Sequence, residues 1–296
     1  MINKIKSYMM PIAMISGGLL YKYVGLLSFL TPFLIAVMLF ITFCNISFQS
    51  IRFSRMHFWL LLIQGTGSII VYLLISPFNV IVAQGAMICI LAPTATSAPV
   101  ITGMLGGNVE SLTAYSLSCN LMIAFFSPVI FALIGEVQSM SFVHSIWIVF
   151  QKIFMLLFLP FIGAILLKRT LPRVHNEIRK RQSISFYLWS IALIIITGKT
   201  ILFIVNQENP NYMVEITISL SALVICVSQF LIGRKIGRKY NDTIAGGQGL
   251  GQKNTILAIW MAQTYLNPIS SIGPGTYILW QNIVNSYQVW RSRRKI

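Results

Sequence analysis

The chain is dominated by apolar segments that are each long enough to cross a lipid bilayer. A helix needs about 20 apolar residues to span the hydrocarbon core, and ten such segments lie between Pro, Gly, Asn or charged residues. Only 9% of the 296 residues are charged, whereas soluble domains carry about 25%. We therefore predict an all-α membrane protein with ten transmembrane helices. The segments are 7–25, 27–46, 57–76, 79–105, 109–135, 145–168, 184–205, 212–233, 242–265 and 268–290.

The basic residues between these segments predict the topology. The side that carries the N-terminus holds 18 of the 22 Lys and Arg residues, and the other side holds only Lys22. Lys152, Lys199 and Lys253 fall inside segments. By the positive-inside rule the basic side is cytoplasmic, so we expect a multi-pass protein of a bacterial-type inner membrane with both termini in the cytoplasm. The net charge of +16 then reflects contact with lipid and topology, and we expect no nucleic acid partner.

The residue types that build metal, disulfide and catalytic sites are sparse and scattered. The four cysteines, Cys44, Cys89, Cys119 and Cys226, lie in or beside apolar segments without CxxC or histidine spacing. The six acidic residues and three histidines lie mostly at segment ends or in loops. We therefore predict buried reduced thiols, no metal, no cofactor and no enzyme activity.

Ten segments divide into two sets of five. An odd number of spans in each half makes the halves opposite in orientation, which is the inverted-repeat arrangement of many secondary carriers. We predict one transporter domain, 1–296, with repeats at about 7–135 and 145–290. In that arrangement the site lies where paired broken helices meet, and the two most interrupted segments are the fourth and the ninth.

The fourth segment is interrupted by Pro93 and Pro99, with the hydroxyls of Thr94, Thr96 and Ser97 between them. The prolines remove two backbone donors, and freed carbonyls at membrane depth survive only inside protein or along a wet cavity. This pattern predicts an unwound crossing that binds substrate. The alternative is a Pro-kinked helix whose hydroxyls bond back to its own carbonyls.

The ninth segment contains four glycines between 246 and 251, followed by Gln252, Lys253, Asn254 and Thr255. Glycine costs about 1 kcal/mol against alanine in a helix, so we expect the chain to unwind at the glycine run. A lysine near the middle of a span usually faces a cavity or a partner. The alternative for Lys253 is a side chain that reaches along the helix to the membrane interface.

Three stretches resemble the bile acid:sodium symporter superfamily. Pro93–Val109 resembles that family's crossing followed by Gly-Asn-Val, and Gly251–Thr255 resembles its second crossing. Trp280-Gln281-Asn282-Ile283 resembles its Trp-His-Asn-Ile stretch in the last span. The resemblance implies helices 4 and 9 that cross at the substrate site. It also implies a panel of spans 1, 2, 6 and 7 and a core of spans 3–5 and 8–10.

The resemblance also implies roles for individual residues. Thr96, Asn254 and Asn282 match positions that contact substrate, and Gln281 stands in place of a histidine. The substrate-binding residues are therefore expected to be Thr94, Thr96, Ser97, Lys253, Asn254, Gln281 and Asn282. Gln64 matches a sodium-site glutamine, and Ser116 replaces a liganding threonine. The expected remnants of the cation sites are Gln64, Ser116, Gln252 and Lys253.

The sodium ligands implied by the family are largely replaced. A Ser-Asn pair appears as Ala98-Pro99, a serine as Leu112, the shared glutamate as Gly249 and a glutamine as Lys253. Because hard cations need several oxygen ligands, we expect no sodium coupling and an ammonium in the cation's place. Burial penalises the charged form of a lysine, so a Lys253 that gains and loses a proton would couple transport to protons.

These patterns predict a secondary active or facilitative transporter that moves a small organic anion by alternating access. Two alternatives stay open: a sodium-coupled symporter with altered sites, and a non-transporting sensor or scaffold on the same fold. The sequence leaves the substrate, the direction of transport and the oligomeric state undetermined.

Overall fold

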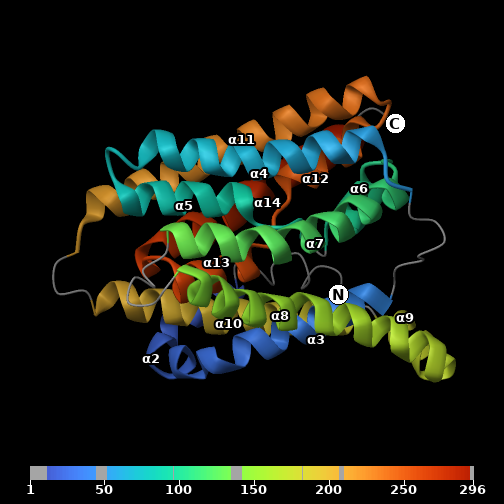
Figure 1. Cartoon of the computed structure of the whole chain (residues 1–296), viewed down its shortest axis with the longest axis horizontal. Coiled ribbons are helices and arrows are strands. Elements are labelled where there is room, and N and C mark those ends of the chain that lie inside the picture. Colours follow the sequence, from blue (N-terminus) through green and yellow to red (C-terminus); the bar gives the residue numbers. More distant parts are fainter. Residues whose placement is uncertain are drawn as a thin grey trace. The chain divides into compact units, whose positions relative to one another are not determined.

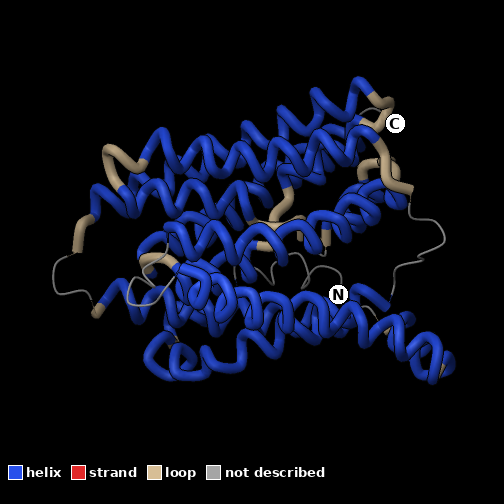
Figure 2. The backbone as a smooth tube through the Cα atoms, in the orientation of Figure 1, coloured by secondary structure: helices blue, strands red, loops and turns tan. Residues whose placement is uncertain are grey.

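The computed structural model describes residues 12–44, 52–95, 97–134, 142–181, 183–206 and 210–293. These ranges are helical almost throughout and contain no β-strand (Figures 1 and 2). The chain forms two compact units. Unit 1 comprises Met1–Ile46 and Ile148–Pro210, and unit 2 comprises Ser47–Trp147 and Asn211–Ile296. Each unit is thus assembled from two stretches that lie far apart in the sequence.

Unit 1 packs its helices through close backbone approaches at glycine. A Cβ on Gly17 would lie 2.5 Å from the Ile194 carbonyl oxygen, and one on Gly198 would meet the Val24 side chain. Small residues let helix backbones approach in this way. The elements of unit 1 are residues 12–19, α2 (Tyr21–Val24), η1 (Gly25–Leu30), α3 (Thr31–Cys44), α8 (Phe142–Thr170, in unit 1 from Ile148), α9 (Pro172–Lys180) and α10 (Ser183–Val205).

Unit 2 contains both interrupted segments, and each is split into two helices. Asn79 begins the first of these by accepting a 3.0 Å hydrogen bond from the Val82 amide, which satisfies one of the free donors at a helix N-terminus. The elements of unit 2 are α4 (Arg55–Ile75), α5 (Val80–Leu91), α6 (Ala98–Met104), α7 (Val109–Ile134), α11 (Tyr212–Lys239), α12 (Thr243–Gly251), α13 (Thr255–Tyr265), η3 (Pro268–Ser271) and α14 (Ile272–Arg293).

Four described helical stretches are long and apolar enough to cross a membrane. They are Tyr21–Cys44, Arg55–Ile75, Val109–Ile134 and Tyr212–Lys239. Their outward-facing side chains include many large apolar groups, such as Phe58, Leu73 and Leu220, which a lipid environment would cover. The protein is therefore an all-α membrane protein, as predicted. The count of ten spans and the inverted repeat stay predictions.

The glycine run of the ninth segment is helical, which corrects the prediction that it unwinds. It forms α12, and the chain leaves the helix only at Gln252. The glycines serve packing instead: a Cβ on Gly246 would lie 2.5 Å from the Gly233 carbonyl oxygen, and one on Gly251 would enter the Phe230 ring. Tertiary contact with α11 therefore outweighs the weak helix propensity of glycine.

We expect Gly246→Ala to destabilise the protein, because the new methyl group has no room between α12 and α11. Overpacking of this kind costs about 1–3 kcal/mol, so the midpoint of thermal unfolding in detergent should fall. Gly65→Ala is the matched control, because a Cβ on Gly65 in the middle of α4 meets nothing within 4 Å. An unchanged midpoint for Gly246→Ala would contradict the close packing of α11 and α12.

Candidate functional site

The two helix breaks of unit 2 meet each other. Residues 92–97 connect α5 to α6, and residues 252–254 connect α12 to α13; we call these two connections together the junction. Thr94 and Lys253 form an isolated antiparallel bridge there. The Ala95 amide donates to the Gln252 carbonyl oxygen at 3.0 Å. The Asn254 amide donates to the Pro93 carbonyl oxygen at 2.7 Å.

The hydroxyl groups of the fourth segment bond to the other half of the junction. Thr94 is fully buried and donates to the Gly249 carbonyl oxygen at 2.9 Å. Exposed Ser97 accepts a 3.0 Å hydrogen bond from Gln252 Nε2. The alternative of a kinked helix whose hydroxyls bond to its own carbonyls is therefore wrong for Thr94. Thr96 lies outside the described residues.

Lys253 is buried at the centre of the junction. Its residue is 1% exposed, and its Nζ donates to the Ile90 carbonyl oxygen of α5 at 2.8 Å. Its backbone amide donates to Gln281 Oε1 on α14 at 2.9 Å. The alternative of a lysine that reaches the membrane interface is therefore wrong. The ammonium lies at the carbonyl end of a broken helix, where a helix dipole stabilises positive charge.

Side chains satisfy the other carbonyls that the break in α5 sets free. Gln64 Nε2 on α4 donates to the Leu91 carbonyl oxygen at 2.9 Å and to that of Ala92 at 2.8 Å. Gln229 Nε2 on α11 donates to the Cys89 carbonyl oxygen at 3.2 Å. A buried carbonyl left without a donor costs about 1–3 kcal/mol. Donors from three elements therefore hold the broken end of α5 in place.

Three buried residues at the junction were missed by sequence reasoning. Tyr277 on α14 donates to the Gly251 carbonyl oxygen at 2.8 Å and accepts from Gln229 Nε2 at 3.1 Å. Tyr115 on α7 donates to Gln64 Oε1 at 2.8 Å. Gln229 was detectable as a single amide in an apolar helix, as Gln64 was. The tyrosines gave no such signal, because tyrosine is common in membrane helices.

Several oxygen atoms at the junction that a sodium ion could use already have hydrogen-bond donors. Gln64 Oε1 already accepts hydrogen bonds from Tyr115 and from the Cys119 thiol. The Leu91 and Ala92 carbonyls accept from Gln64, and the Ile90 carbonyl accepts from the Lys253 ammonium. A cation at these oxygens would compete with those donors and lie near the Lys253 side chain, so no transport step is assigned to sodium.

The remaining predicted residues lie farther from the centre of the junction. Asn254 is 8% exposed and caps α13 by accepting from the Leu257 amide at 3.2 Å. Half-buried Asn282 donates to the Ile278 carbonyl oxygen of its own helix at 2.6 Å. The Ser116 carbonyl oxygen accepts from Asn120 Nδ2 one turn later in α7, which ties that residue to its own helix.

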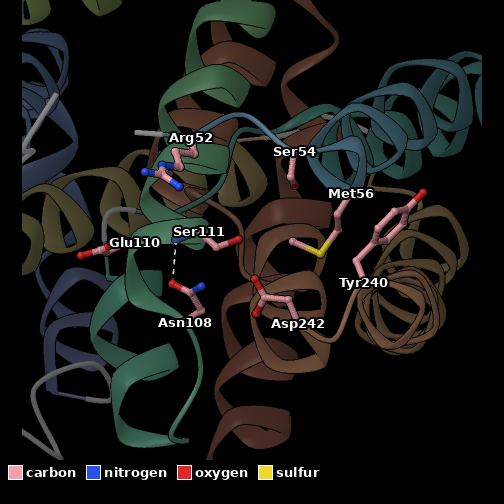
Figure 3. A pocket seen from close by; sticks show the side chains of 8 residues that line it. All are labelled: Arg52, Ser54, Met56, Asn108, Glu110, Ser111, Tyr240 and Asp242. Atoms are coloured by element: carbon pink, nitrogen blue, oxygen red, sulfur yellow. Dashed lines mark hydrogen bonds between the residues drawn. The ribbon is translucent and has the colours of Figure 1, made fainter. Parts of the chain in front are cut away.

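A separate pocket of about 330 Å³ lies where α4, α7 and α12 begin. Figure 3 shows the Ser111 hydroxyl and the Asp242 carboxylate facing its central space, with Met56 beside them. The Glu110 side chain points away from Asp242. The pocket is lined by Arg52, Ser54, Met56, Asn108, Glu110, Ser111, Tyr240 and Asp242.

We expect Gln64→Leu to lower the stability of the protein, because it leaves the Leu91 and Ala92 carbonyls and the Tyr115 hydroxyl without their partner. Each buried unsatisfied group costs about 1–3 kcal/mol. Thr66→Val in the same helix is the control, because exposed Thr66 bonds only to the Leu62 carbonyl of α4. Equal thermal unfolding midpoints for the two variants in detergent would refute the role of Gln64.

The sequence was compared with known protein families. The sequence profile of the SBF-like CPA transporter family matches residues 45–279. That range contains both helix breaks, Gln64 and Gln229, and therefore the whole junction. A comparison with curated proteins gave no match.

Proposed function

The chain belongs to the SBF-like CPA transporter family, and we propose that it carries a small organic anion across the membrane by alternating access, without sodium coupling. Membership agrees with the resemblance to bile acid:sodium symporters seen in the sequence. It makes the protein a multi-pass membrane protein of a transporter family. The nature of the substrate, the absence of sodium coupling and the alternating movement are the proposal.

The observation that carries the proposal is the buried ammonium of Lys253. It donates to a carbonyl, and the only ion pair in the described ranges joins Lys180 to Glu177 at 2.9 Å. Neutral acceptors compensate a buried charge incompletely. The junction therefore keeps a positive potential that favours a carboxylate or a sulfonate over a neutral or cationic substrate.

The proposed substrate contacts are the less buried polar groups of the junction. Ser97 is exposed and Asn282 is half-buried, and Asn254 is 8% exposed, more than its neighbours Gln252 and Lys253. Thr94, Lys253 and Gln281 are engaged in hydrogen bonds at the junction. We therefore propose that they act on the anion indirectly, by holding the junction in position and through its electric field. Thr96 belongs to the proposed set by its place in the sequence.

Unit 2 is proposed as the core domain and unit 1 as the panel of the transport cycle. In support, unit 2 contains the helices of the third to fifth and eighth to tenth predicted segments, and unit 1 contains the others. The proposed location is the inner membrane with both termini in the cytoplasm. Transport is proposed to be either facilitative or linked to protons, because the Lys253 ammonium takes the place of a metal ion.

The proposal is tested by uptake of labelled organic anions, chosen by a thermal-shift screen, into vesicles that contain the purified protein. We expect uptake that ignores a sodium gradient. Lys253→Gln should reduce it about tenfold or more, since a hydrogen bond to a charged group is worth about 1.5–3 kcal/mol. Lys22→Gln, which removes an exposed lysine at the end of α2, should leave uptake unchanged.

Uptake driven by a sodium gradient would overturn the proposal, as would full activity of a folded Lys253→Gln variant. Thermal unfolding and size-exclusion chromatography in detergent establish whether each variant folds. If Lys253→Gln fails to fold, Asn254→Ala serves as the second variant. Binding of an anion without any uptake would identify a sensor instead of a carrier.

A further inference from the structure

A fully buried histidine lies behind the pocket at the start of α4. His57 is in the first turn of that helix and is 0% exposed. It forms a capping box with Ser54: the His57 amide donates to Ser54 Oγ at 3.4 Å, and the Ser54 amide donates to His57 Nδ1 at 3.3 Å. The other ring nitrogen, Nε2, lies 3.0 Å from Ser111 Oγ. Both bonding partners of the ring line the pocket.

These hydrogen bonds define the protonation state of the imidazole. A ring nitrogen that accepts from a backbone amide carries no proton, so Nδ1 is bare. A neutral imidazole has one N–H, and here it is Nε2–H, which donates to Ser111. The structure thus holds His57 neutral. Protonation would place a hydrogen on Nδ1 that faces the hydrogen of the Ser54 amide, and that bond would break.

A carboxylate that would balance the new positive charge lines the same pocket. Asp242 occupies the N-cap position of α12, but its side chain makes no capping hydrogen bond. It has no ion pair within the described part of the chain, and it lines the same pocket as Ser54 and Ser111, the two residues that bond to the His57 ring. A carboxylate beside an imidazole favours the imidazolium form.

The other charged and titratable groups near His57 do not replace Asp242. Arg52, just before α4, is exposed and repels an imidazolium. Glu110 on α7 is exposed and points away from Asp242. Tyr115 on α7 lies against the imidazole, with ring centroids 6.0 Å apart. A phenol stays protonated near neutral pH. Tyr240, at the end of α11, lines the far side of the pocket.

We propose that His57 and Asp242 form a proton-binding site at this pocket, on the side of the membrane that the charge distribution predicts to be cytoplasmic. As the pH falls, one proton from the aqueous solution binds to Nδ1. The Ser54 bond breaks, and a neutral imidazole beside a carboxylate becomes an imidazolium–carboxylate pair. The pair joins α4 to α12, so proton binding acts on two helices that both lead to the junction.

Helices α4 and α12 connect the proposed proton-binding site directly to the junction. On α4, Gln64 lies two turns beyond His57 and holds the Leu91 and Ala92 carbonyls. On α12, the helix that Asp242 begins ends at the junction. If the proposed transport is linked to protons, this site supplies the cytoplasmic binding step, and that extension rests on the proposed function. Proton binding itself does not depend on transport.

The test is a nuclear magnetic resonance titration of the purified full chain, with labelled histidine rings, between pH 5 and 8. His57→Asn assigns the His57 signal among the three histidines. We expect this signal to titrate in that range, and Asp242→Asn should move its midpoint to lower pH, because the neutral amide no longer favours the imidazolium form. Glu110→Gln is the matched control and should leave the midpoint unchanged.

A His57 signal that does not titrate, or a midpoint that Asp242→Asn leaves in place, would overturn the proposal. If Asp242→Asn fails to fold, hydrogen exchange of the first turn of α4 gives a second measurement in the unmodified chain. Exchange there should rise as pH falls through the midpoint, after correction for the intrinsic rate, because the Ser54 amide loses its acceptor. Unchanged protection would also refute the site. A titrating site in a chain that transports nothing would reject the proposed function alone.

Discussion

The structure of unit 2 depends on one constraint, which is that the backbone carbonyls freed by a broken helix need donors inside the protein. In a membrane, water is not available to satisfy them, and each unsatisfied group is costly. The carbonyls of Cys89, Ile90, Leu91 and Ala92 end α5, and each accepts from a side chain of another element. The positions of α4, α11 and the α12–α13 connection follow from where these donors must be.

The same requirement explains why a lysine lies at the junction. Either a bare metal ion or an ammonium group can stabilise carbonyl dipoles that point at one place. The amine is covalently attached and stays with the protein, whereas an ion binds and leaves. Hydrogen-bond donors of the protein already reach Gln64 Oε1 and the α5 carbonyl oxygens. A positive charge at this position is the physical basis of the proposal that the substrate is an anion.

The glycine run of α12 shows where local rules mislead. Helix propensity predicts an unwound chain at residues 246–251, yet they form a helix. Gly246 lies against the backbone of Gly233, and Gly251 lies against the ring of Phe230. The chain unwinds one step later, at residues 252–254, where it meets the break in α5. A propensity of about 1 kcal/mol for each glycine is small beside the packing that close helix contact permits.

The sequence by itself determined the class of the protein, the position of the break after α5 and the presence of a central lysine. Those features are local, because hydropathy, the missing donor of proline and the cost of a mid-span charge act within one segment. Only the tertiary structure decided which donor meets which carbonyl. Lys253 and Ile90 are 163 residues apart, and Gln64 and Tyr115 are 51 apart. Such pairings depend on how helices pack, which no short stretch of sequence specifies.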